Sequence, residues 1–240
     1  MTGNTWAYLF LADLLAELVA IATGWHTIRL FTKPLLAIIL FAGFMLSSIQ
    51  FLPLRYYIAA ALFFSWLGDV FLLPQMKGND WFMAGLGSFL LAHAMYILFF
   101  LRVRGRQQHP VAYKGYLVIL LIIYAIGLFV FLYPYIENLR WPVALYAITI
   151  IAMLVTAIHA FKNNTLQAAR YCITGAALFV VSDSLLALNK FYQVFPGANI
   201  AIMLTYGLAQ VALTKGSLQY LAGEKQGLVD AGYHSRSNKK

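Results

Sequence analysis

The stretch LFFSWLGDVFLLP, residues 62–74, is apolar enough for a lipid environment, yet it contains one carboxylate, Asp69. A second apolar stretch, ALFVVSDSLLAL at 177–188, contains Asp183 in similar company. An acidic residue at the centre of a bilayer costs roughly 2.5–3.5 kcal/mol on insertion scales, so each one needs a partner or a function. These two stretches decide both the fold class and the candidate site.

The composition is typical of a polytopic membrane protein. Of the 240 residues, 62% are hydrophobic and 10% are charged, and the mean hydropathy is +0.76. Soluble domains contain roughly 45–50% apolar and about 25% charged residues. The net charge of +9 comes from basic residues in short loops and near the C-terminus, where they meet headgroups and set orientation. Since there is no dense basic patch and no recognition motif, we exclude nucleic acid as a partner.

The sequence predicts an all-α bundle of eight transmembrane helices, which forms one domain over residues 1–221. A helix needs about 20 apolar residues to cross a bilayer. The segments that fit are residues 5–22, 34–51, 55–73, 80–101, 113–133, 142–161, 168–189 and 198–220. All seven prolines lie at or near segment ends, so no span is expected to break in its middle. Residues 222–240 are polar and aperiodic, and we expect a disordered cytoplasmic tail.

The distribution of basic residues predicts the orientation. Twelve of the 17 Lys and Arg residues fall on the side of the two termini and five on the other side. The positive-inside rule then places both termini in the cytoplasm. The N-terminal segment lacks the positive region of a signal peptide, and we expect it to be a retained first span. The expected location is a bacterial inner or plasma membrane.

Few ionisable residues lie within the predicted spans. Asp69 and Asp183 each lie about fifteen residues into a span that runs outward from the cytoplasm, so we expect them at similar depth beyond the midplane. Lys33 begins a span on that outer side and either reaches the same layer or extends to the interface. Further polar side chains that can face this layer are Ser65, His93, Tyr96, Ser182, Tyr206 and Gln210.

Each of these residues also has a purely structural interpretation. A lone buried Asp can bond a neighbouring Ser, Tyr or Gln and fix helix packing, and His93 is more often a packing residue than a ligand. Asp13 and Glu17, one turn apart, are either a proton-sharing pair or a polar stripe that faces the bundle. Only His93 and His159 lie near the membrane interior, so we predict no metal site. No nucleophile elbow and no phosphate-binding glycine loop occur.

Five segments repeat the order and the span positions of a known family. They are TKPL (32–35), FSWLGDVFLL (64–73), GLGSFLLAHAMY (85–96), GAALFVVSDSLLA (175–187) and YGLAQ (206–210). In these segments the chain resembles the YhhN/TMEM86 family of lysoplasmalogenases. The resemblance implies an eight-helix membrane hydrolase that needs no cofactor and takes a lysophospholipid from the bilayer. Its expected products are a fatty aldehyde and glycerophosphoethanolamine or glycerophosphocholine.

The resemblance also implies roles for the site residues. Lys33, Asp69, His93, Ser182 and Asp183 fall on the family's polar positions, with Asp69 and Asp183 as the catalytic candidates. Lys33, His93 and Ser182 are then substrate-binding candidates, to which the helix faces add Ser65, Tyr96, Tyr206 and Gln210. A vinyl ether opens when its carbon is protonated, so the reaction calls for one protonated carboxyl and one carboxylate that activates water. Which aspartate has which role stays open at this point.

A different class of function also fits the membrane-embedded acids. In a proton-coupled transporter or a lipid-binding protein, Asp13, Glu17, Asp69 and Asp183 would be proton or ion sites. Transporters typically place broken helices at the bilayer midplane, in corresponding positions of two halves. The prolines do not follow that pattern, so we favour the hydrolase.

Overall fold

A computed structural model describes residues 5–48, 53–73, 78–106, 115–161 and 166–237, and no strand occurs among them. The all-α prediction is confirmed for these residues. The α-helices are α1 (Thr5–Thr23), α2 (His26–Ser47), α3 (Arg55–Phe71), α4 (Asn79–Gly105), α5 (Gly115–Leu132), α6 (Arg140–Ala160), α7 (Leu166–Ala187) and α8 (Ala198–Ser237). Two 3₁₀ turns, η1 (Tyr133–Tyr135) and η2 (Glu137–Leu139), join α5 to α6, and a π-helical turn, η4 (Leu188–Tyr192), continues α7.

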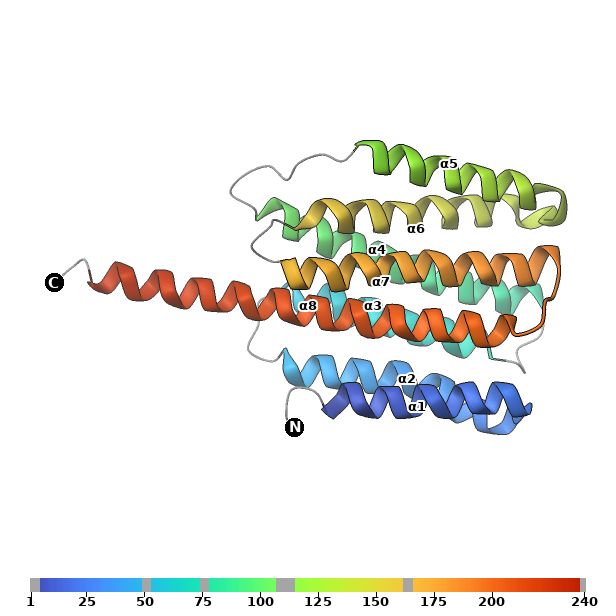
Figure 1. Cartoon of the computed structure of the whole chain (residues 1–240), viewed down its shortest axis with the longest axis horizontal. Helices are drawn as coiled ribbons and strands as arrows, with labels where there is room; N and C mark the ends of the chain where they lie inside the picture. The colour runs from blue at the N-terminus through green and yellow to red at the C-terminus, as the bar shows by residue number, and fades with distance from the viewer. Residues whose placement is uncertain (1–4, 49–52, 74–77, 107–114, 162–165, 238–240) are drawn as a thin grey trace.

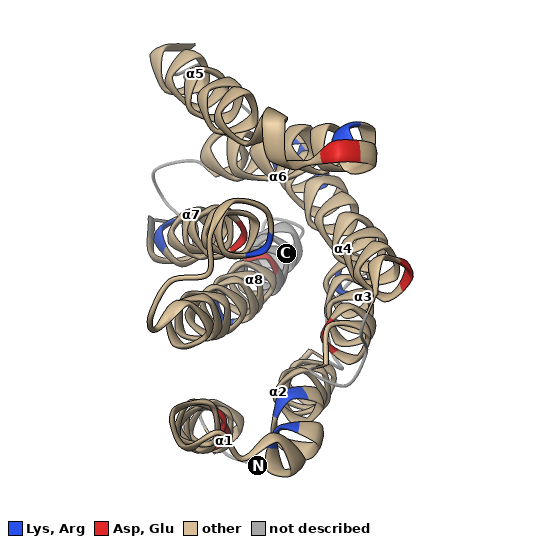
Figure 2. Cartoon of the chain, turned by 90° about the vertical axis from the view of Figure 1, so that its right-hand side faces the viewer, with Lys and Arg blue, Asp and Glu red and all other residues tan. Residues whose placement is uncertain are grey.

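The helices form an arc around a central pair. Viewed along the bundle, α1, α2, α3, α4, α6 and α5 follow one another around the arc, and α7 and α8 lie on its inner side (Figure 2). Helix α4 therefore packs against α6, and α5 contacts the outer side of α6. Both termini lie at the same end of the bundle (Figure 1).

The close contact between α7 and α8 depends on two glycines. A Cβ added to Gly175 would lie 2.9 Å from the carbonyl oxygen of Ala209, and one added to Gly216 would lie 2.9 Å from the backbone nitrogen of Cys172. Any larger side chain would push the two helices apart. Small residues thus bring α7 and α8 into backbone contact, as they often do in membrane bundles.

The second helix begins earlier than its sequence suggested. Helix α2 starts at His26, so Pro34 lies inside it and does not open it. The polar residues before Pro34 resembled a loop, but this first part of α2 is held to α1 by side-chain bonds. Glu17 of α1 accepts hydrogen bonds from Arg29 Nε at 3.0 Å and from the Thr32 hydroxyl at 2.5 Å. Tertiary contacts therefore outweigh the local helix-breaking signal of the proline.

The last helix is longer than expected. Helix α8 continues past residue 220 to Ser237, into the segment that we expected to be disordered. That segment contains glycine but no proline. A proline would remove a backbone donor and clash with the preceding turn, so no residue of this kind ends the helix here. The side chain of Arg106, at the end of α4, forms an ion pair with Glu224 in this extension.

The surface of the bundle is suited to lipid. Leu132 is the only buried residue of α5, and its outward side chains include Ile119, Ile123 and Val130, each more than 60% exposed. Exposed apolar area on this scale belongs in a bilayer. Six of the eight described helices are long and apolar enough to cross it, namely all except α3 and α8. The chain is a multi-pass integral membrane protein.

Candidate active site

A polar cavity opens near the end of the bundle where α2 and α8 begin and α3 ends. Its volume is about 180 Å³. The polar residues in its wall are Arg29 and Lys33 of α2, Asp69 of α3, Ser182 and Asp183 of α7, and Asn199 and Tyr206 of α8. Figure 2 looks onto this end of the bundle, with acidic residues in red and basic residues in blue. The cavity thus brings together both intramembrane aspartates singled out in the sequence.

Asp69 lies at the end of a hydrogen-bonded chain of side chains. The hydroxyl of Tyr206 donates to Asp69 Oδ2 at 2.6 Å, and Gln210 Nε2 donates to the Tyr206 hydroxyl at 3.1 Å. The Tyr96 hydroxyl in turn donates to Gln210 Oε1 at 3.2 Å. Every hydrogen in this chain points toward Asp69, which is the arrangement that a carboxylate favours.

Lys33 supplies a positive charge beside the same carboxyl. Its Nζ lies 3.9 Å from Asp69 Oδ1 and donates a hydrogen bond to the carbonyl oxygen of Leu72 at 2.9 Å. Only 8% of this lysine is exposed. Lys33 therefore points inward to the acid layer and does not extend to the membrane interface.

Gly68 lets α4 approach α3 beside Asp69. A Cβ at this position would lie 2.6 Å from the ring of Phe89, so the glycine leaves room for an aromatic side chain that also lines the polar cavity. The small residue preceding the acid thus shapes the wall of the site.

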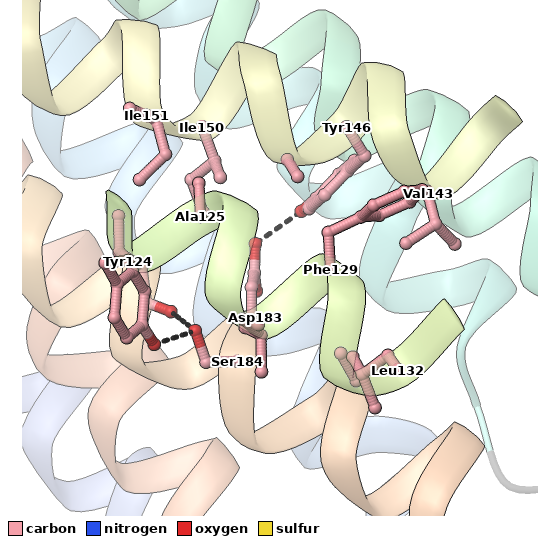
Figure 3. Close-up of a pocket in the computed structure, with 14 residues that line it drawn as sticks. Tyr124, Ala125, Phe129, Leu132, Val143, Tyr146, Ile150, Ile151, Asp183 and Ser184 are labelled. Carbon is pink, nitrogen blue, oxygen red and sulfur yellow. Dashed lines mark hydrogen bonds between the residues drawn. The ribbon is translucent and has the colours of Figure 1, made fainter. Parts of the chain in front are cut away.

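Asp183 has a different set of neighbours. The hydroxyl of Tyr146, on α6, donates to Asp183 Oδ2 at 2.5 Å (Figure 3). Among the described residues no Lys, Arg or His forms an ion pair with Asp183. Within the described ranges its hydrogen-bonding partner is a neutral phenol, and no cation lies beside it as Lys33 lies beside Asp69.

Asp183 also lines a second, apolar cavity between α5, α6 and α7. This cavity has a volume of about 70 Å³, and its wall includes Ala125, Phe129, Val143, Ile150 and Val180 (Figure 3). The polar groups at its wall are Tyr124, Tyr146, Asp183 and Ser184, and the Tyr124 hydroxyl donates to Ser184 Oγ at 2.7 Å. The same carboxyl group is therefore in the wall of two cavities of opposite character.

The predicted substrate-binding residues fall into two groups. Lys33, Ser182 and Tyr206 line the polar cavity, whereas Ser65, His93, Tyr96 and Gln210 do not. Tyr96 and Gln210 instead belong to the hydrogen-bonded chain that ends at Asp69.

His93 and Ser65 are buried behind the cavity wall. The His93 ring lies edge-on to the rings of Tyr146 and Phe179, with centroids 5.3 and 4.7 Å apart, and neither ring nitrogen has a hydrogen-bonding partner in the described part of the chain. The Ser65 hydroxyl is likewise buried without a partner. Their placement favours packing for both residues.

Three residues at the candidate site were not predicted from the sequence. Arg29 and Asn199 line the polar cavity, and Tyr146 bonds Asp183. Arg29 was missed because the start of α2 was placed too late. Tyr146 was missed because one tyrosine among fifteen carries no distinguishing signal until its helix is packed against α7.

The buried acid Glu17 is hydrogen-bonded by side chains of α2. It is fully buried and bonded to Arg29 and Thr32, which ties α1 to α2 directly behind the cavity wall. This supports a structural role for Glu17, with Arg29 held in the wall of the site as a consequence.

Comparison with known proteins gives relatives over most of the chain. The sequence profile of the YhhN family matches residues 28–217. Proteins named lysoplasmalogenase from Mycobacterium bovis and Mycobacterium tuberculosis are each 31% identical over 164 residues, which cover 68% of this chain and 60% of each relative. A Bos taurus protein named lysoplasmalogenase TMEM86A is 29% identical over 191 residues, covering 74% of this chain and 70% of that protein.

The match with the mycobacterial relatives leaves more than a third of their length uncovered. No solved structure matches the chain significantly. All five motifs quoted from the sequence lie within the matched residues 28–217, so the resemblance is confirmed: the chain belongs to the YhhN family.

Proposed function

We propose that this protein hydrolyses the vinyl ether of a lysoplasmalogen and releases a fatty aldehyde and glycerophosphoethanolamine or glycerophosphocholine. The observation that carries the proposal is that Asp69 and Asp183 line one cavity but have unlike partners. Relatives named lysoplasmalogenase support the same reaction.

The reaction needs one acid, one base and one water molecule. The acid transfers a proton to the second carbon of the vinyl ether, which leaves an oxocarbenium-like cation at the first carbon. Water adds to that carbon while the base takes one of its protons, and the resulting hemiacetal breaks its bond to the glycerol oxygen. The glycerol oxygen takes up a proton, the aldehyde departs, and one water is consumed in total. Two carboxyl groups in different surroundings can divide this work.

The surroundings of the two aspartates suggest which role each one has. Both carboxyls accept a hydrogen bond from a tyrosine hydroxyl, but only Asp69 also lies beside the Lys33 ammonium, so the ionised form of Asp69 is stabilised and suits the base. Asp183 has a neutral phenol as its partner and borders an apolar cavity, so it suits the acid. The Lys33 ammonium, 3.9 Å from Asp69 Oδ1, favours the carboxylate form, so Asp69 is less suited than Asp183 to donate the proton.

The membrane placement adds a further element to the proposal. We propose that all eight helices cross the bilayer with both termini in the cytoplasm, so that the polar cavity opens on the opposite side. The even number of passes agrees with the two termini at one end of the bundle (Figure 1). We also propose that residues 1–221 act as one membrane domain.

A proton-coupled transporter is the second candidate, and the helix geometry makes it less favourable. Helix α3 runs without a break through Asp69 and α7 runs without a break through Asp183. Transporters typically bind ions at unwound segments that expose backbone carbonyls. Continuous helices at both acids favour chemistry by side chains over ion coordination by the backbone.

The experiment is aldehyde release from a defined substrate. The purified protein in detergent micelles is given a lysoplasmalogen and, in parallel, the matched 1-O-alkyl lysophospholipid, which has a saturated ether. Release of fatty aldehyde from the first and not from the second is the expected result, because only the vinyl ether can be opened by carbon protonation. Absence of aldehyde from the vinyl ether would refute the proposed function.

A further inference from the structure

Helix α7 separates the two cavities, and Asp183 lies on the boundary. Val180, Ser184 and Ala187 line the apolar cavity, whereas Ser182 and Leu186 line the polar cavity. The first set follows the i, i+4, i+7 spacing of one helix face, and the second set follows the neighbouring face. Asp183 belongs to both sets. A molecule with its reacting bond at Asp183 can therefore extend into both cavities.

We propose that the apolar cavity between α5, α6 and α7 is the binding site for the hydrocarbon chain of the substrate. The inference rests on the proposed function, in which the reacting bond lies at Asp183. In a vinyl ether lipid that bond is the junction between an apolar chain and a polar glycerophosphate headgroup. The protein offers the same junction, with apolar side chains on one side of Asp183 and Arg29, Lys33 and Asn199 on the other.

The shape of the apolar cavity fits the part of the chain nearest to the ether. Its lining runs along α5 from Tyr124 to Leu132, a distance of about 12 Å at the rise of an α-helix. The cavity volume is about 70 Å³, so the carbons next to the vinyl ether fit inside it and the remainder of the chain continues into the bilayer.

Helix α5 provides the route by which a chain enters from the membrane. Leu132 is its only buried residue, and Tyr124 is 43% exposed, so one wall of the cavity is a helix that faces lipid on its other side. The Tyr124–Ser184 hydrogen bond is a contact that links α5 to α7 at this wall. A chain that slides between α5 and α7 reaches Asp183 without crossing water.

The test fills the cavity and reads out the length of the substrate chain. Ala147, on α6, lines the apolar cavity, and Ala147→Phe puts a ring into the space proposed for the chain. The control is Ile148→Phe, because Ile148 lies one position further on α6 and is 67% exposed on the lipid side. Each variant is given a long-chain lysoplasmalogen and a truncated vinyl ether that ends at the two vinyl carbons.

The expected result is a change in chain preference. Ala147→Phe should lower kcat/KM for the long chain by about tenfold or more, since burial of roughly two methylene groups is worth that much. For the truncated substrate the change should stay within about twofold, and Ile148→Phe should change neither value. Equal losses on both substrates, or no loss on either, would overturn the proposal.

A binding experiment separates this inference from the proposed reaction. A saturated 1-O-alkyl lysophospholipid with a diazirine on the chain near the ether is photolysed with the wild-type protein, and adducts are mapped by mass spectrometry. Adducts on the α5 and α6 residues of the apolar cavity, absent in Ala147→Phe and kept in Ile148→Phe, would support the chain site even if no vinyl ether were cleaved. Adducts confined to exposed lipid-facing residues would refute it.

Discussion

Asp69 and Asp183 face the same cavity, but the protein surrounds them in different ways. Asp69 lies 3.9 Å from the Lys33 ammonium and accepts a hydrogen bond from the last of three polar side chains that are bonded in series. Asp183 has one phenol and the edge of an apolar cavity. In the proposed mechanism the two carboxyls hold different protonation states at the same pH, as acid–base catalysis with two carboxyls requires.

The largest loss of activity is expected when the ionisable group of either aspartate is removed. Asp69→Asn and Asp183→Asn should each lower aldehyde release by about 10²–10⁴-fold, because asparagine keeps the size but cannot exchange a proton. The double variant should be little worse than either single one, since the pair acts as a unit. Asp13→Asn is the control, because Asp13 is an acid of α1 that lines neither cavity.

If both Asn variants release aldehyde at near wild-type rates, the aspartates are packing residues and not catalytic ones. Equal elution of all variants as monodisperse protein in size-exclusion chromatography is the check that the fold is intact.

The tyrosines that bond the two aspartates test whether one carboxyl is ionised and the other is neutral. Tyr206→Phe removes a hydrogen bond to the carboxyl beside Lys33, and Tyr146→Phe removes one to Asp183. Hydrogen bonds to charged groups are worth more than those between neutral groups, so kcat/KM should fall about 10- to 100-fold for Tyr206→Phe and about three- to tenfold for Tyr146→Phe. The reverse order of the two losses would contradict the assigned roles.

Lys33 tests how much of the difference comes from charge. Lys33→Met keeps the aliphatic stem but removes the ammonium beside Asp69, so we expect kcat/KM to fall about tenfold without complete loss, because Tyr206 still stabilises the carboxylate. The matched control is Lys190→Met. In the wild type the Lys190 ammonium lies 4.9 Å from the centroid of the Phe82 ring, and Lys190 does not line the polar cavity. A Lys33→Met enzyme as active as the control would show that the charge is not needed.

The smallest effect on catalysis is expected from the ion pair behind the cavity wall. Glu17→Gln leaves Arg29 with a neutral acceptor in place of a buried carboxylate, and the weaker hydrogen bonds should lower the free energy of unfolding by about 1–3 kcal/mol. Thermal unfolding in detergent measures this loss. Activity of the folded fraction should change by less than about threefold, because Glu17 lines neither cavity. A loss of activity as large as that of Asp69→Asn would place Glu17 in the reaction.

Several features of the fold were predictable because they depend on composition and period. Long apolar segments gave the helices, and Asp69 and Asp183 stood out because an acid in such a segment is costly. For Lys33 the sequence left two positions open, the acid layer and the membrane interface, and its burial in the structure decides for the acid layer.

The features that were missed depend on packing between distant segments. Helix α2 begins at His26 because Arg29 and Thr32 bond Glu17 across to α1, and local sequence contains no record of that partner. Tyr146 reaches Asp183 only because α6 lies beside α7. His93 looked like a site residue, but the rings of Tyr146 and Phe179 enclose it. Pairing of helices, rather than the character of each one, decided these positions.

The most direct test of the division of roles between Asp69 and Asp183 is infrared difference spectroscopy of the protonated carboxyl groups at neutral pH. Spectra of the wild type, Asp69→Asn and Asp183→Asn are compared in the region where the C=O stretch of a protonated carboxylic acid absorbs. If Asp183 is the acid and Asp69 the base, Asp183→Asn loses one such band, whereas Asp69→Asn loses none and its carboxylate band decreases. Loss of the protonated band in Asp69→Asn, or in neither variant, would contradict the division of roles between the two aspartates.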